Sequence, residues 1–244
     1  METASQHHIK QAEQPLERFR EIVGKYLDPS AVWTRFFQAN NFVDTMIRFD
    51  APPFCKHILL IYEEIESARK LELRYLKNQL QSGQTCACLI HGVDVKADEN
   101  LLRIEMIDNG IDLEVAEKTG KLRIIPMDGE VLEKYNLENL KTSSEIVEAF
   151  LELLTQGTGL PTAGIGKTAS DEELSNPERL ALRLEVEQIA NKMYTQYDGT
   201  WVCPYHVNNL QESLHEEWVE KLVLNHDAVI YLPKNSNGLA MRLI

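Results

Sequence analysis

The residues Gly-Ile-Gly-Lys-Thr at 164–168 resemble the end of a phosphate-binding loop. Such a loop needs Gly-x4-Gly-Lys-Ser/Thr between a strand and a helix, because the glycines let successive backbone amides face the phosphates. Here the first glycine position is Pro161, which has no amide proton to donate. The segment before it reads as a helix, and the carboxylates at 171–173 would repel phosphate. We therefore predict a flexible loop or a degenerate strand at this position.

Cysteines and histidines gather in two places in the chain. The two groups are Cys203, His206, His215 and His226, and Cys86, Cys88 and His91. A structural zinc site usually takes four ligands in two short-spaced pairs, and neither group provides two such pairs. Cys86 and Cys88 also belong to an apolar run, in which buried and inert thiols are usual. The sequence therefore predicts no metal ligands and identifies no cofactor.

Hydrolytic catalysis needs a nucleophile, a base and a group that orients the base. The chain has no Gly-x-Ser-x-Gly elbow around a nucleophilic serine. Glu185 and Glu187 could supply carboxylates, but charges on a long helix are usually a solvated face. The sequence therefore leaves enzymatic activity open and favours a protein that does not catalyse a reaction.

Composition restricts the possible partners. The 244 residues are 43% hydrophobic and carry a formal net charge of −13. Nucleic-acid affinity comes mainly from Lys and Arg at the phosphates, so we expect neither nucleic acid nor an anionic membrane as a partner. No apolar run approaches the roughly 18–20 residues that span a bilayer, and the polar N-terminus lacks the apolar core of a signal peptide. We expect a cytoplasmic protein with reduced thiols.

Short apolar runs alternate with amphipathic segments along most of the chain. Strands are predicted at 57–62, 85–91, 121–127, 200–205 and 228–233, with 239–244 as a further candidate. Helices are predicted at 66–81, 100–109, 112–118, 143–154, 177–197 and 209–224. Continuous apolar strands and regular alternation are typical of an α/β fold, in which a mostly parallel sheet carries helices on both faces. We assign this α/β domain to residues 54–244.

The residues before the domain have a different pattern. Residues 1–14 are polar and predicted to be disordered, and residues 15–50 are predicted to be a helical extension. The helix expected at 31–49 is unusually aromatic and includes Trp33, Phe36, Phe37 and Phe42. We interpret the extension as a helical pair that packs on the domain, or as a surface for dimerisation or output.

Four stretches of the chain, taken together and in order, resemble one family. They are FCKHILLIYEEIESARKLELRYLKNQLQSGQTCACLIH (54–91), NGIDLEVAEKTGKLRII (109–125), WVCPYHVNNL (201–210) and LVLNHDAVIY (222–231). The matching residues are His57, Tyr62, Glu63, Gly83, Cys88, Gly110, Asp112, Gly120, Cys203, Tyr205, His226 and Val229. This pattern is similar to the methanogen/methylotroph sensory (MEDS) domain, which was named from a dichloromethane-responsive regulator.

The resemblance implies a fold and a role. Members of the family are regarded as degenerate relatives of RecA/KaiC-type ATPase domains that lack the phosphate loop. The turn after the first strand, Glu63-Glu64-Ile65-Glu66-Ser67, is acidic and has no glycine, which agrees with that description. Members usually sit beside a DNA-binding domain or a histidine kinase. Because the residues before position 54 are too few and too acidic for a helix-turn-helix, we expect a standalone sensor or a subunit that acts through a partner.

Ligands of open α/β sheets bind outside the carboxyl ends of the strands. The side chains that we expect there are Tyr62, Glu63, His91, Asp128, Tyr205 and His206. We therefore predict a small-molecule sensory domain with its ligand at this edge and its output through a protein partner or self-association. Two alternatives remain. One is a nucleotide-binding switch or ATPase-like enzyme with a non-standard phosphate loop, and the other is a structural scaffold without a ligand.

Overall fold

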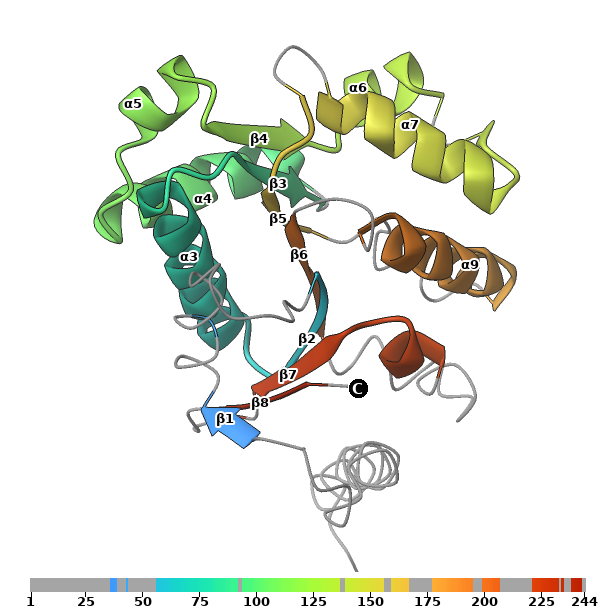
Figure 1. Cartoon of the computed structure of the whole chain (residues 1–244). Helices are drawn as coiled ribbons and strands as arrows, with labels where there is room; N and C mark the ends of the chain where they lie inside the picture. Colours follow the sequence, from blue (N-terminus) through green and yellow to red (C-terminus); the bar gives the residue numbers. More distant parts are fainter. Residues whose placement is uncertain are drawn as a thin grey trace, which may run out of the picture.

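The computed structural model describes residues 36–38, 43, 56–91, 94–136, 139–155, 159–166, 177–194, 199–206, 221–232, 234 and 238–242. They form an eight-stranded sheet with helices on both faces (Figure 1). The strands are β1 (Phe36–Gln38), β2 (His57–Tyr62), β3 (Cys86–Ile90), β4 (Leu122–Pro126), β5 (Ala163–Ile165), β6 (Thr200–His206), β7 (Ala228–Leu232) and β8 (Leu239–Arg242). Their order is β1-β8-β7-β2-β6-β5-β3-β4. The six strands from β7 to β4 are parallel, while β8 is antiparallel to β7 and β1 is antiparallel to β8.

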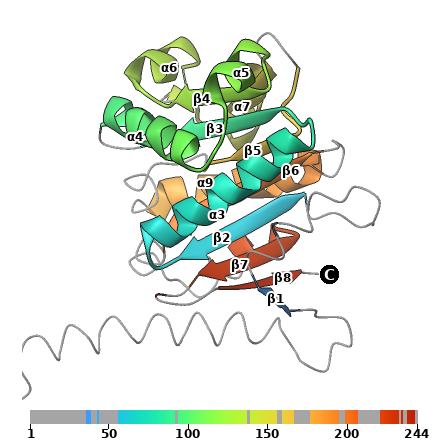
Figure 2. The ribbon, with the colours of Figure 1, turned by 90° about the vertical axis from the view of Figure 1, so that its left-hand side faces the viewer.

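The helices divide between the two faces according to their place in the chain. They are α3 (Ile65–Gln81), α4 (Val95–Asp108), α5 (Leu113–Lys118), α6 (Gly129–Lys134), α7 (Ser143–Thr155) and α9 (Pro177–Tyr194). The two views show α3, α4 and α5 over one face and α7 and α9 over the other (Figures 1 and 2). The chain moves outward from β2 to β4 with helices on the first face, and returns through β5 and β6 with helices on the second. This arrangement confirms the predicted α/β fold class.

Alternation of side chains along the buried strands builds two hydrophobic cores. In β2, Ile58 and Leu60 pack with α3, whereas Leu59 and Ile61 pack with α7 and α9. Because successive side chains of a strand point to opposite faces, a strand covered on both sides must be apolar at every position. This requirement explains the unbroken run of Ile58, Leu59, Leu60 and Ile61.

Helices α4 and α6 begin where aspartate side chains cap their first turns, and the apolar periodicity of the sequence did not predict these starting points. The side chain of Asp94 accepts a hydrogen bond from the Ala97 amide, so α4 begins five residues before the predicted start at 100. The carboxylate of Asp128 caps α6 in the same way through the Val131 amide, and this short helix was not predicted.

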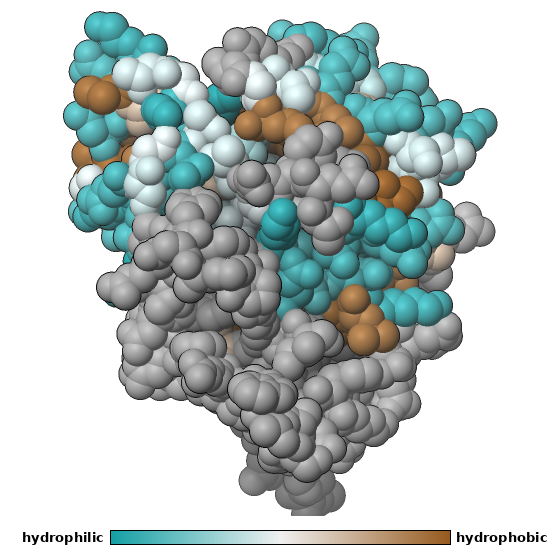
Figure 3. Space-filling view, in the orientation of Figure 1, coloured by the Kyte–Doolittle hydropathy of each residue, from teal (hydrophilic) through white to brown (hydrophobic). Residues whose placement is uncertain are grey.

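Among the described helices, none combines the length and the apolar character needed to cross a bilayer. The described surface seen in Figure 3 is mostly hydrophilic.

The prediction of a helix at 31–49 was wrong for residues 36–38. This segment is strand β1, which pairs with β8 through Phe36 opposite Met241 and Phe37 opposite Ala240. The aromatic run is compatible with a strand as well as with a helix. The backbone groups on the outer edge of β8 pair with this segment, and this pairing favours the strand. Residues 1–35 and most of 39–55 lie outside the described residues, and so do the tail and extension predicted there.

Of the two interpretations of residues 163–165, the degenerate strand is confirmed. Strand β5 lies between β3 and β6, with Gly164 opposite Trp201. The Trp201 indole N–H donates to the Gly166 carbonyl at 2.8 Å, which holds the ring across Gly164. A Cβ atom on Gly164 would lie 2.0 Å from a carbon of this ring. Gly164 therefore leaves the space in the sheet that the indole fills.

We predict that Gly164→Ala lowers the free energy of unfolding by about 1–3 kcal/mol, because the added methyl group overlaps a buried ring that a hydrogen bond holds in place. Urea denaturation followed by circular dichroism measures the change. Gly129→Ala is the matched control, since a Cβ there meets no atom within 4 Å, and it should stay within about 0.5 kcal/mol of the wild type. Equal stability of the two variants would contradict this packing of Trp201.

Candidate functional site

A cavity of about 190 Å³ opens at the carboxyl ends of β2, β3 and β5, on the face that α3 and α4 cover. Tyr62 at the end of β2 and His91 after β3 both line it, so the structure brings together two of the six predicted site residues. Further lining comes from α3, α4 and β6, including Arg69, Glu72, Cys88, Asp98, Leu102 and Pro204. Residues from both halves of the sheet therefore surround one small space.

The polar groups of this cavity include an arginine with two carboxylate partners and a neutral thiol. The Arg69 guanidinium lies 3.1 Å from the Glu72 carboxylate on the next turn of α3, and its Nε lies 3.4 Å from Glu105 of α4. Burial, followed by the nearby charge of Glu72, raises the pKa of the Cys88 thiol, which keeps it protonated. The cavity thus presents the Arg69 guanidinium with its two carboxylate partners, the carboxylate of Asp98, one neutral thiol and the rings of Tyr62 and His91.

The other four predicted site residues lie outside this lining. The Glu63 carboxylate accepts hydrogen bonds from the Tyr231 hydroxyl and from the Lys234 amide, and so ties the turn after β2 to the end of β7. Asp128 caps α6 after β4. His206 packs edge-on against the Tyr62 ring, with the ring centroids 5.2 Å apart. Tyr205 points to the opposite face of the sheet.

The position of a phosphate loop in this topology is occupied by carboxylates. Glu63, Glu64 and Glu66 surround the start of α3, and Glu64 at the N-cap makes no capping hydrogen bond with its side chain. The Gly166 amide, which belongs to the Gly-Lys-Thr sequence, donates to the Val202 carbonyl at 3.0 Å as part of the sheet. It is therefore not available to a phosphate, while Lys167 and Thr168 lie outside the described residues.

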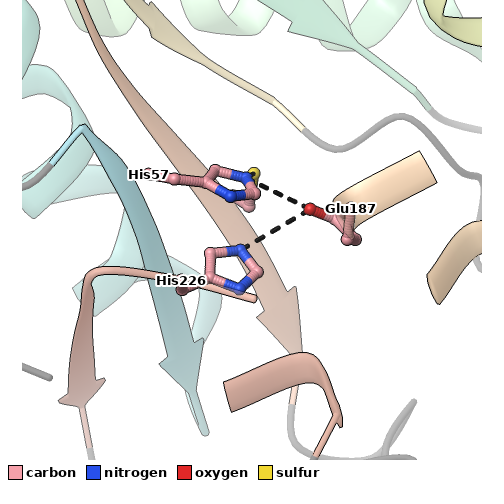
Figure 4. A group of neighbouring side chains, drawn as sticks. His57, Glu187 and His226 are labelled. Carbon is pink, nitrogen blue, oxygen red and sulfur yellow. Dashed lines mark hydrogen bonds and ion pairs between the residues drawn. The ribbon is translucent and has the colours of Figure 1, made fainter. Parts of the chain in front are cut away.

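A second group of functional side chains lies on the other face of the sheet, beneath α9 (Figure 4). It consists of His57, the first residue of β2, Glu187 of α9, Cys203 of β6 and His226 just before β7. All four side chains are buried, and their potential ligand atoms lie within 4.8 Å of one another. We call these four residues the buried tetrad.

Short distances connect the members of the buried tetrad. The Glu187 Oε2 atom lies 3.1 Å from His57 Nε2 and 3.6 Å from His226 Nε2. The Cys203 Sγ atom lies 3.3 Å from His57 Nε2. The two imidazole rings stack with their centroids 3.9 Å apart, as Figure 4 shows. Two nitrogens, one carboxylate oxygen and one sulfur therefore face a common point.

The backbone around Asp227 aligns the two histidines. Its carboxylate accepts hydrogen bonds from the amides of Lys56 and His57, at 2.7 and 3.1 Å. Its own amide donates to the His57 carbonyl at 2.7 Å. Because these bonds join the start of β2 to the start of β7, His57 and His226 lie side by side although they are 169 positions apart in the chain.

Backbone carbonyls orient both imidazole rings. His57 Nδ1 lies 2.9 Å from the Asn225 carbonyl, and His226 Nδ1 lies 2.7 Å from the Leu222 carbonyl. A carbonyl oxygen can only accept, so each ring carries a proton on Nδ1 and turns Nε2 toward Glu187. The Tyr205 hydroxyl donates to the other carboxylate oxygen of Glu187 at 2.7 Å. The two carbonyls and the Tyr205 hydroxyl, which do not belong to the tetrad, thus each fix the orientation of one tetrad residue.

Burial sets the charges of the tetrad. It raises the pKa of Glu187, but the hydrogen bond and charge of His57 and the hydrogen bond of the Tyr205 hydroxyl outweigh it and lower that pKa to about 2. Burial and the neighbouring His57 lower the pKa of His226 to about 3, so this imidazole is neutral. Burial and the Glu187 charge raise the pKa of the Cys203 thiol well above its usual range. The tetrad therefore contains an ionised carboxylate beside a neutral imidazole.

The sequence analysis did not identify this tetrad. Glu187 was placed on a solvated face, but only 3% of it is exposed, whereas Glu185 two positions earlier is exposed. The buried residues of α9 are Arg183, Val186 and Glu187, whose i, i+3, i+4 spacing places them on one face of the helix. The short spacing of Cys203 and His206 in the sequence also suggested that these two side chains lie together, but the side chain that Cys203 contacts is His57.

We predict that Glu187→Ala lowers the free energy of unfolding by about 3–5 kcal/mol, because it leaves buried polar groups of His57 and Tyr205 without their partner. Glu185→Ala on the same helix should change it by less than about 0.5 kcal/mol. Urea denaturation of both variants measures the difference. If the two variants unfold at the same urea concentration, the polar contacts of Glu187 beneath α9 do not contribute to stability, and the prediction is wrong.

Comparison with known proteins relates this geometry to a family. The family model of the methanogen/methylotroph DcmR sensory domain matches residues 56–221, more than half of the chain. Among solved structures, a KaiC-like protein from the archaeon Pyrococcus horikoshii is 14% identical, with a TM-score of 0.48 over 76% of each chain. The flagellar accessory protein FlaH from Methanocaldococcus jannaschii is 13% identical, with a TM-score of 0.45 over 78% of this chain and 75% of that one. No curated protein matches the sequence significantly. The match confirms the resemblance drawn from the sequence, and the chain belongs to the MEDS sensory-domain family.

Proposed function

We propose that the chain is a non-catalytic sensory domain that binds a small molecule in the cavity at the carboxyl edge of its sheet. The observation that carries the proposal is the cavity itself, which lies where open α/β sheets bind their ligands. Its lining joins α3 and α4 to the ends of strands from both halves of the sheet. A ligand there contacts segments that are far apart in the sequence and can bias their arrangement.

The size and lining of the cavity restrict the ligand class. A volume of about 190 Å³ is below the roughly 300–1,000 Å³ of sites for drug-sized molecules, so the ligand has few heavy atoms. Leu102 and Ile165 provide apolar contacts, while Arg69 and His91 provide polar contacts for one end of the molecule. This combination favours a short, weakly polar compound over a nucleotide.

The alternative of a nucleotide switch has less support. Carboxylates of Glu63, Glu64 and Glu66 surround the N-terminus of α3, where the phosphates would have to bind. Their charges repel phosphate and offset the attraction of the helix N-terminus for an additional anion. The remaining alternative, a scaffold without a ligand, leaves the cavity without a role.

Helix α4 supports an output through a protein partner. Its inner face contributes Asp98 and Leu102 to the cavity. On its outer face Leu101, Ile104 and Ile107 are each more than half exposed. A ligand that prefers one position of α4 would shift the population of that position and present these apolar side chains differently to a partner.

We expect a thermal-shift screen of short-chain alcohols, carboxylates, amines and dichloromethane to yield a stabilising compound. A ligand at 100 times its dissociation constant adds about 2.7 kcal/mol, which raises the melting temperature by roughly 5–10 °C for a domain of this size. Arg69→Ala and His91→Ala should abolish the shift because both side chains line the cavity. Arg103→Ala is the matched control, since Arg103 is equally exposed but pairs with Glu99 and Glu117 outside the cavity.

The outcomes separate the three functions. A shift that survives Arg69→Ala and His91→Ala would place the ligand elsewhere and contradict the proposed site. A shift with Mg-ATP, but with none of the small compounds, would favour the nucleotide switch. Absence of any shift would favour the scaffold.

A further inference from the structure

We infer that the buried tetrad of His57, Glu187, Cys203 and His226 binds one divalent transition-metal ion of the zinc class, which fastens α9 to the sheet. This inference is independent of the proposed sensory function. It concerns the face of the sheet opposite to the ligand cavity, and it rests on the donor atoms, their separations and their surroundings.

The separations between the donor atoms suit a four-coordinate ion. Ligand atoms arranged tetrahedrally at the usual zinc distances of about 2.0–2.3 Å lie about 3.3–3.8 Å apart. In the tetrad, three of the pairs lie at 3.1, 3.3 and 3.6 Å, and all the ligand atoms lie within 4.8 Å of one another. Small shifts of side chains on a strand, a helix and a loop are sufficient to place an ion between them.

The orientation of the imidazoles is that of metal ligands. Metal-binding histidines usually donate their second ring N–H to a carbonyl or carboxylate, which fixes the tautomer and aims the other nitrogen at the ion. Both histidines meet this condition through Asn225 and Leu222. The Tyr205 hydroxyl restrains the carboxylate of Glu187 in a comparable way.

One atom of the tetrad points independently to a ligand. His226 Nε2 is buried and has no hydrogen-bond partner among the described residues, although it faces Glu187 at 3.6 Å. With Nδ1 protonated, this Nε2 carries a lone pair, which the carboxylate cannot satisfy because it also only accepts. A buried polar atom without a partner costs about 1–3 kcal/mol, and coordination of a cation removes that cost.

The charge and softness of the donors select the class of ion. A divalent ion balances one carboxylate and one cysteine thiolate, so the occupied site has no net charge in an apolar core. Calcium and magnesium prefer sites made of oxygen ligands only. Imidazole and thiolate ligands suit zinc and its transition-metal neighbours. Four protein ligands, each at most 3% exposed, leave no open position for a substrate, which is typical of structural sites.

Metal analysis of the whole chain, expressed without a polyhistidine tag, tests the inference. We expect about one zinc ion per chain after purification, or after removal of metal with a chelator and return of Zn²⁺. Replacement by Co²⁺ should produce a thiolate charge-transfer band and the intense visible bands of a four-coordinate ion. Ca²⁺ and Mg²⁺ should not compete. Substoichiometric Zn²⁺ and Co²⁺ in protein that is folded by circular dichroism would overturn the inference.

Variants test which residues bind the ion. His226→Gln should remove stoichiometric binding, whereas His206→Gln should retain it, because His206 lies outside the tetrad although it stands three positions from Cys203. Tyr205→Phe should weaken zinc binding by about 10–100-fold, as loss of an outer hydrogen bond does. Equal metal loss in His206→Gln and His226→Gln would overturn the assignment. If His226→Gln does not fold, the Co²⁺ spectrum of the wild type decides, since without the thiolate band Cys203 is not a ligand.

Discussion

The buried carboxylate of Glu187 is the constraint on which the contact between α9 and the sheet depends. Removing an ionised carboxylate from water costs several kcal/mol unless hydrogen bonds and opposite charges replace the solvent. Here the replacements come from His57 at the start of β2 and from Tyr205 of β6. Helix α9 can therefore pack on the sheet only when β2 and β6 have their native register. The burial of Glu187 thus couples the packing of α9 to the pairing of these two strands.

The sheet separates two sites of different character. Cys203 and Pro204 are neighbours in β6, but Cys203 belongs to the buried tetrad and Pro204 lines the cavity. The alternation of side chains along a strand thus places two different side-chain environments on opposite faces of the same segment. The tetrad is buried and held by hydrogen bonds to two backbone carbonyls and from the Tyr205 hydroxyl, which suits a stabilising role. The cavity lies between α3, α4 and the strand ends, where small movements change its shape.

The acidic turn after β2 holds the ends of two neighbouring strands together. Glu63 uses both carboxylate oxygens to hold Tyr231 and Lys234 at the end of β7. The Gly166 amide completes the pairing of β5 with β6 instead of facing a ligand. Groups near the carboxyl edge therefore stabilise the sheet, and the cavity lies further along that edge, beneath α3.

The sequence by itself determined the parallel core, its helices and the family, because apolar runs, amphipathic periods and motif order are local properties of the chain. It also identified Tyr62 and His91 at the carboxyl edge, since strand ends can be predicted from those runs. Only the tertiary structure decided that Phe36–Gln38 is a strand, that Ala163–Ile165 enters the sheet, and that Glu187 is buried. It also decided that His57, Cys203 and His226 meet. These features depend on strand order and register, which bring distant residues together through pairings that no local pattern encodes.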